Sequence, residues 1–145
     1  MRSKTSLFLM ELIIATLFFA LSSTVCIQMF IKGHQISDAN EARNHAMLCA
    51  QSLMEAYEAY DGDLAFTATL YENADLDNAT LTVYYTDSWQ LISSENATYQ
   101  ATLTVSETDT DRLYHLNLSV IKLSTEKSLF AADTTFYLQE GRGSE

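Results

Sequence analysis

The chain contains no proline and only four glycines among its 145 residues. Proline is the residue that removes a helical hydrogen bond and clashes with the preceding turn, so its absence leaves a long helix free to continue. The four glycines form no glycine-rich loop of the kind that holds a phosphate group. The sequence therefore permits long helices and argues against a phosphate-binding loop.

Cysteine and histidine are also scarce. Cys26 and Cys49 are 23 residues apart, which is about 35 Å along a continuous helix. The Cα atoms of a disulfide lie within about 7 Å of each other, so we expect two buried free thiols. The three histidines, His34, His45 and His115, lack the spacing of metal ligands and are expected at the surface. No catalytic constellation can be read from the spacing, and no enzyme is predicted.

Basic residues are few, with eight Lys and Arg against 19 Asp and Glu. Residues 32–145 hold six of the basic and 18 of the acidic residues, a net charge of −12. Such acidity argues against nucleic acid or an anionic lipid surface as a partner, because both would repel it. It suits a secreted, soluble domain with a charged, solvated surface.

One long apolar run, residues 7–31, contrasts with this acidity. It has 25 residues with one formal charge, and about 20 suffice to span a bilayer as a helix. Arg2 and Lys4 precede it, which predicts a cytoplasmic N-terminus. The apolar region of a secretory signal is shorter, about 7–15 residues. Ala20-Leu21-Ser22 nevertheless offers a small-x-small site, so a secreted domain released after Ser22 is one alternative.

The single charge in this run is Glu11. A charge at the centre of a bilayer costs about 2.5–3.5 kcal/mol on insertion scales. A carboxylate in lipid must therefore be neutralised or paired, and residues 7–31 contain no Lys or Arg. A plain membrane anchor gives no reason for Glu11, although its side chain could reach the cytoplasmic headgroups.

Lys4-Thr5-Ser6 followed by Leu7-Phe8-Leu9-Met10-Glu11 resembles the class III signal of type IV pilins and type II secretion pseudopilins. That resemblance implies that a prepilin peptidase cuts between Ser6 and Leu7 and methylates the new N-terminus. The family usually has Gly and Phe at these two positions. It also implies that Glu11 pairs with the N-terminal ammonium of an adjacent subunit and sets the register of one helix against the next.

After the apolar run, apolar or small residues recur at helical spacing, which predicts a helix continuing to Tyr60. These residues are Ile36, Ala39, Ala42, Ala46, Ala50, Leu53, Tyr57 and Tyr60. Gly33 is a weak point, costing about 1 kcal/mol relative to Ala. Asp61-Gly62-Asp63 ends this helix by turn chemistry.

Beyond the turn the pattern changes to period two, which predicts β-strands. We expect strands at 80–85, 99–106 and 113–120, with 134–138 as a last strand and 66–71 as either a strand or the end of the helical region. The predicted fold is α+β, with a long N-terminal helix packed on a small antiparallel sheet, as in pilins. The expected parts are a leader (1–6), a membrane and assembly helix (7–31), an amphipathic continuation (32–60) and an extracytoplasmic β domain (61–145).

Acidic pairs in the predicted turns are weak calcium candidates, because Ca²⁺ prefers oxygen ligands. Asp109 and Asp111 form one such pair. Some pseudopilins bind calcium in loops beside the sheet, but no segment here fits an EF-hand loop and aspartate-rich turns are common without metal. No other cofactor is expected.

We interpret the chain as a pilin-like protein, a minor pilin or pseudopilin of a type IV pilus, type II secretion or DNA-uptake filament. The resemblance implies other pilin subunits, the prepilin peptidase, an inner-membrane assembly platform and, before assembly, membrane lipid as partners. The protein would first cross the cytoplasmic membrane once, with its N-terminus inside, and then enter a filament. The alternative is a membrane-anchored extracytoplasmic binding domain that does not polymerise.

Overall fold

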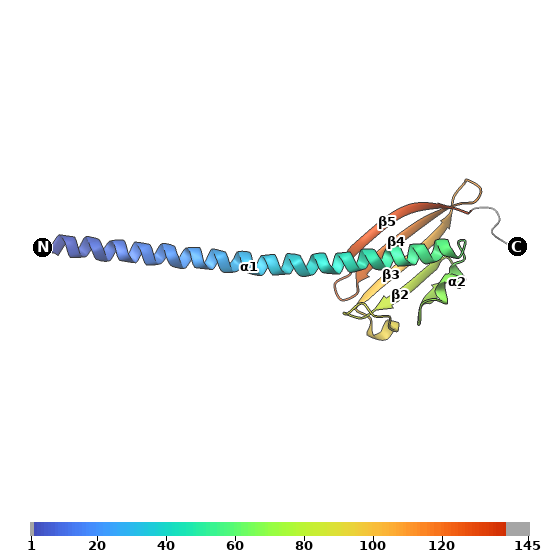
Figure 1. Ribbon diagram of the computed structural model, residues 1–145, viewed down its shortest axis with the longest axis horizontal. Coiled ribbons are helices and arrows are strands. Elements are labelled where there is room, and N and C mark those ends of the chain that lie inside the picture. Colours follow the sequence, from blue (N-terminus) through green and yellow to red (C-terminus); the bar gives the residue numbers. More distant parts are fainter. Residues whose placement is uncertain (1, 139–145) are drawn as a thin grey trace. The chain divides into compact units, whose positions relative to one another are not determined.

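The computed structural model describes residues 2–138, and the chain divides into two compact units at the boundary between Glu41 and Ala42. Each unit is described by itself. The elements, drawn in Figure 1, follow one another in the order helix, short helix and five strands. They are α1 (Arg2–Ala59), α2 (Leu64–Ala68), β1 (Asp75–Asp77), β2 (Thr80–Tyr85), a 3₁₀ turn (Ser94–Asn96), β3 (Tyr99–Glu107), β4 (Leu113–Lys122) and β5 (Lys127–Tyr137).

The first helix confirms the prediction of an uninterrupted helix through Gly33. It begins within the leader and ends at Ala59, one residue before the predicted Tyr60. Asp61 and Gly62 then adopt left-handed φ angles of 51° and 79°. The amide of Gly62 donates to the carbonyl of Tyr57 at 3.0 Å. Gly62 is the second residue after the cap, and this bond is that of a Schellman motif at a helix C-terminus.

The segment after this turn forms a separate short helix, α2, which corrects the expectation of a strand or helix end at 66–71. The Asp63 carboxylate accepts a hydrogen bond from the Phe66 amide at 3.0 Å and so caps the N-terminus of α2. Asp is among the preferred N-cap residues because its oxygen satisfies an otherwise free backbone N–H. The same aspartate that was predicted to end the first helix therefore begins the second.

The strands form one antiparallel sheet in the order β1-β2-β3-β4-β5. β2, β3 and β4 lie where the period-two pattern predicts them. β5 begins at Lys127, earlier than the predicted start at Thr134, because a register shift opposite Val120 and Ile121 disturbs its alternation. β1 was missed because its sequence, Asp-Leu-Asp, resembles a turn. The α+β fold class is confirmed.

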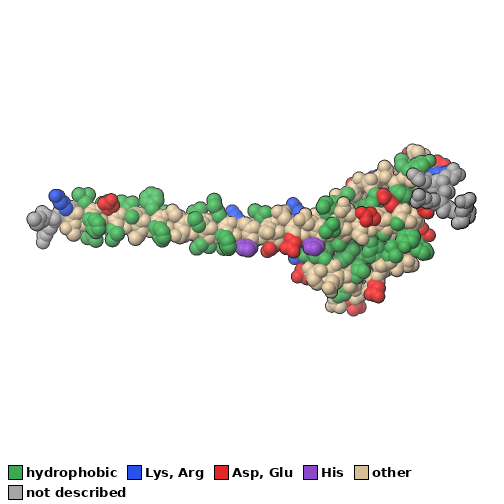
Figure 2. Space-filling model, viewed as in Figure 1, with side chains coloured by type: hydrophobic (Ala, Val, Ile, Leu, Met, Phe, Trp, Pro, Cys, Tyr) green, Lys and Arg blue, Asp and Glu red, His purple; other side chains and the backbone are tan. Residues whose placement is uncertain are grey.

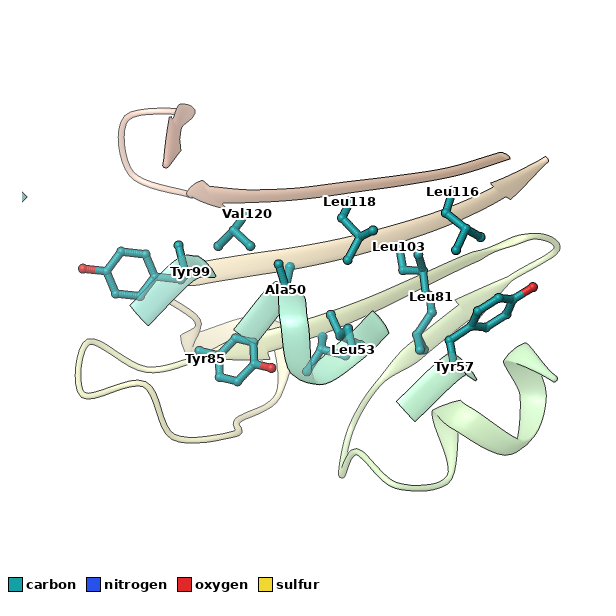
Figure 3. Packing of buried hydrophobic residues seen from close by; sticks show 13 residues of the cluster. Ala50, Leu53, Tyr57, Leu81, Tyr85, Tyr99, Leu103, Leu116, Leu118 and Val120 are labelled. Atoms are coloured by element: carbon teal, nitrogen blue, oxygen red, sulfur yellow. The ribbon is translucent and has the colours of Figure 1, made fainter. Parts of the chain in front are cut away.

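The core lies between one face of the sheet and residues 42–59 of α1 (Figure 3). Alternate residues of β2 are buried, as expected for a strand with one face against a helix. On α1, small side chains at Ala46 and Ala50 and large ones at Leu53 and Tyr57 are 0–2% exposed. Ala39, which the predicted apolar series included, is exposed. The buried face of α1 therefore begins later than the sequence suggests.

The two cysteines are free, as expected, but the prediction that both are buried is wrong. Cys26 is exposed and Cys49 is half-buried. Cys26 lies in the apolar half of α1, where no described part of the same chain covers the helix. His34 and His115 are exposed as predicted, whereas His45 is half-buried.

Candidate functional site

The first half of α1 is apolar and uncovered. α1 is long and apolar enough near its N-terminus to cross a membrane. Figure 2 shows hydrophobic side chains along this part of α1 and one acidic side chain near its start. Sixteen large apolar residues of this segment are 47–76% exposed, and they are Leu7, Phe8, Leu9, Met10, Leu12, Ile13, Ile14, Leu17, Phe18, Phe19, Leu21, Val25, Ile27, Met29, Phe30 and Ile31.

Hydroxyl groups within the apolar segment bond back to the helix itself. Thr16 donates to the carbonyl of Leu12 at 2.8 Å, Ser23 to that of Phe19 at 2.9 Å, and Thr24 to that of Ala20 at 3.0 Å. Such bonds satisfy side-chain donors without water, which a hydrocarbon environment requires. The polar groups here, Glu11 excepted, are thus largely compatible with lipid or with a packed bundle of helices.

Glu11 lies one helical turn after Leu7, on the exposed surface of α1. Among the residues that the structure describes, its carboxylate makes no ion pair. Lys4 and Lys32, the nearest basic residues in the sequence on either side, are about 10 and 32 Å away along the helix axis. No Lys or Arg side chain within the apolar segment can therefore serve as the positive partner of Glu11.

The two predicted processing residues, Ser6 and Leu7, lie within α1. Leu7 is 66% exposed. Residues four apart on a helix are neighbours, so Leu7 and Glu11 share one face. The structure therefore brings the predicted processing point and the lone carboxylate together on one exposed stretch of helix.

The calcium candidates Asp109 and Asp111 are exposed in the loop between β3 and β4. The Asp111 carboxylate lies 3.9 Å from Nε of Arg112. The Thr108 hydroxyl donates to the carbonyls of Leu113 and Thr110, at 2.7 and 3.2 Å, and so closes the loop. Across residues 2–138, no three His, Cys, Asp or Glu side chains come together as a set of metal ligands. The structure thus gives this aspartate pair no third ligand of these types.

Sequence reasoning missed a column of rings around Trp89, the only tryptophan in the chain. Trp89 stacks on Tyr99 with centroids 4.1 Å apart and on His45 with centroids 5.5 Å apart. The Lys122 ammonium lies 5.8 Å from the centre of the Tyr99 ring. Trp89 has a φ of 61°, a conformation that L-residues seldom adopt. The presence of a single tryptophan was the available signal, but it does not identify the residues that contact it.

Beside this column lies an open groove of about 290 Å³, here named the Trp89 groove. Residues from α1, from the segment before β1, from the end of β2 and from the β2–β3 connection line it. They are His45, Leu48, Cys49, Ser52, Tyr71, Tyr85, Trp89 and Leu91. None of the eight is Asp, Glu, Lys or Arg.

Burial raises the pKa values of one thiol and two phenols in this groove. It raises the pKa of the Cys49 thiol, although a hydrogen bond with Tyr85 opposes this. Burial also raises the pKa of Tyr71, and it raises that of Tyr85 far above its usual range, with smaller contributions from Cys49 and Tyr71. All three groups are therefore neutral at physiological pH.

These pKa shifts predict that the free energy of unfolding falls in alkaline solution. The unfolded chain loses protons near the ordinary pKa values, about 8.5 for Cys and 10 for Tyr, whereas the folded chain holds them to higher pH. Stability that is fully present below those values is therefore lost above them, at up to about 1.36 kcal/mol per pH unit for each group. Urea unfolding of the full chain in detergent, followed by far-UV circular dichroism, measures this slope.

Tyr85→Phe is the matched control for this experiment, because it removes the hydroxyl with the most strongly raised pKa. It should flatten the alkaline slope by about 1.36 kcal/mol per pH unit. An unfolding free energy that stays constant from about pH 7 to about pH 11, above the ordinary Tyr pKa, would contradict the account.

Comparison with models of protein families, with characterised proteins and with solved structures found no match to this chain. The architecture itself, a long apolar N-terminal helix followed by a small antiparallel sheet, is compatible with a pilin-like fold. Many α+β domains share a helix on a sheet, so the functional argument depends on the apolar segment and Glu11 rather than on fold alone.

Proposed function

We propose that this chain is a pilin-like structural subunit, a minor pilin or pseudopilin, that assembles into a filament through its N-terminal helix. One observation carries the proposal. Glu11 is the only charge in a 25-residue apolar segment, and it has no ion-pair partner within the described chain. A membrane span that carries an unpaired carboxylate usually does so for a function.

The proposed mechanism begins with cleavage between Ser6 and Leu7 at the cytoplasmic face of the membrane. Removal of residues 1–6 also removes Arg2 and Lys4 and creates a new ammonium group on Leu7. Every processed subunit carries such an ammonium, and the chain's own lies one helical turn before Glu11. In the proposed filament, the ammonium of an adjacent subunit pairs with Glu11. The pair would fix the axial position of each helix against its neighbour.

Assembly would exchange lipid contacts for contacts between helices. The exposed Leu, Ile, Phe and Met side chains of residues 7–31 suit both environments, because lipid tails are as apolar as the side chains themselves. The apolar contacts therefore provide packing but little preference for one register. In this proposal the charge pair at Glu11 supplies that preference, and the subunits, the prepilin peptidase and an inner-membrane platform are the partners.

Substitution at Ser6 tests the processing step. Ser6→Gly introduces the residue that the resembled family usually has, and should be cleaved at least as completely as the natural chain. Ser6→Ile, with a bulky branched side chain before the cut, should retain residues 1–6. The intact mass of each variant, purified from cells that contain a prepilin peptidase, distinguishes the cleaved chain from the chain that retains residues 1–6.

The alternatives predict different masses in the same experiment. An anchored domain that does not polymerise would keep residues 1–6 in the natural chain and in both variants. A secreted domain released after Ser22 would lose residues 1–22 regardless of the residue at position 6. Either result would overturn the proposed function.

A further inference from the structure

The folded unit that begins at Ala42, described here as residues 42–138, is named the head. We propose that the Trp89 groove on the head is a docking site for a second copy of this chain. Its occupant is an apolar side chain exposed on the head of the neighbouring copy. The inference rests on the proposed function, because assembly through α1 is what would bring two heads together. It adds a contact between the heads to the contact between the helices.

Charge is the first reason for choosing a second copy as the occupant. Residues 32–145 carry a net charge of −12, so two copies repel each other over most of their surfaces. The groove is lined by no Asp, Glu, Lys or Arg, and Cys49, Tyr71 and Tyr85 stay neutral because burial raises their pKa values. A basic partner would instead bind the acidic surface. The groove is therefore a place where two like-charged heads can touch without placing like charges together.

Continuity with the assembly helix is the second reason. α1 supplies His45, Leu48, Cys49 and Ser52 to the groove. Their spacing of three, one and three residues is that of a stripe along one side of a helix. The helix that carries the proposed assembly segment therefore also supplies half of the residues that line the groove.

The groove is small and open to solvent, with a volume of about 290 Å³. Leu48 and Leu91 at its sides are 58% and 41% exposed, so apolar surface is already open to solvent there. Figure 2 shows hydrophobic side chains gathered on the face of the head beside α1.

The described part of the head also offers side chains that could enter a groove. Met47, Phe66, Leu70, Leu76 and Tyr137 are 41–56% exposed and do not line it. A contact between one of these and the groove joins two different surfaces of the same chain. A contact of this kind is called heterologous. When the rotation that relates one copy to the next does not close into a ring, repeated heterologous contacts build an open helical array. A filament has this helical symmetry.

A photo-reactive amino acid in place of Leu48, in the full chain in its own cells, tests the inference. We expect crosslinked dimers in which position 48 is joined to the head of a second copy, as mapped by mass spectrometry. Leu91→Asp should lower the dimer yield at least tenfold. Ser124→Asp adds the same charge in the exposed β4–β5 turn and should leave the yield unchanged. Far-UV circular dichroism of each variant confirms that it is folded.

Crosslinking at Cys26 separates this inference from the proposed function. Cys26 lies in the apolar segment, and bismaleimide products mapped to it report on the packing of helices alone. If those products form but position 48 crosslinks only to lipid, to a different protein or to nothing, the docking site is wrong while filament assembly stands. If neither product forms, both proposals fail. Equal dimer yields in Leu91→Asp and Ser124→Asp would also overturn the docking site.

Discussion

Glu11→Ala is expected to remain in the membrane and to be almost absent from filaments. The substitution removes an insertion penalty of about 2.5–3.5 kcal/mol, so the helix should sit in lipid more stably than before. It also leaves the N-terminal ammonium of a neighbouring subunit without its partner. Breaking a buried ion pair by removing one member costs about 3–5 kcal/mol, which corresponds to a loss of assembled protein of about a hundredfold or more. The fraction of protein in sheared filaments, compared with the membrane fraction, measures the effect.

Two further variants show whether the charge itself is responsible. Glu11→Gln keeps the size and the hydrogen-bonding capacity of the side chain but removes the charge, and should be as defective as Glu11→Ala. Met10→Ala, at the adjacent apolar and exposed position, should assemble normally. A Glu11→Ala protein that enters filaments at the natural level would refute the role assigned to this carboxylate.

Leu53→Ala should produce a large loss of stability in the folded unit of residues 42–138. Leu53 is 1% exposed and lies where α1 packs on the sheet (Figure 3). Truncation of a buried leucine to alanine typically costs about 2–5 kcal/mol, because it loses buried area and leaves a cavity. That is a large part of the stability of a small domain, about 5–15 kcal/mol in total. Urea unfolding of the full chain in detergent, followed by Trp89 fluorescence, measures the loss.

Leu48→Ala is the matched control, since it is the same substitution on the same helix at a position that is 58% exposed. Its cost should be within about 0.5 kcal/mol of zero, as for most surface changes. Similar unfolding free energies for the two variants would mean that residues 42–59 of α1 do not pack on the sheet as described.

Regular periodicity is what made much of the fold predictable. The helix through Gly33 and the strands β2, β3 and β4 each repeat one pattern over several residues, and all four lie where the sequence places them. Where the pattern is interrupted, prediction failed. The early part of β5 contains a register shift, and β1 has aspartates that strands generally disfavour.

Of the two candidate sites, Glu11 could be predicted from the sequence and the Trp89 groove could not. Glu11 was visible from sequence because its context is local, a single charge within one apolar run. The Trp89 groove was not, because it depends on contacts between residues distant in sequence. His45 and Trp89 are 44 residues apart, and only the folding of α1 over the β2–β3 connection stacks their rings.

The N-terminal residue of the protein purified from its own cell membrane tests the central claim most directly. Intact mass and sequencing of the terminal peptide would identify it. The account predicts a chain that starts at Leu7 and carries one added methyl group. A chain that starts at Met1 in a cell with a prepilin peptidase, or one that starts near Ser23, would contradict it.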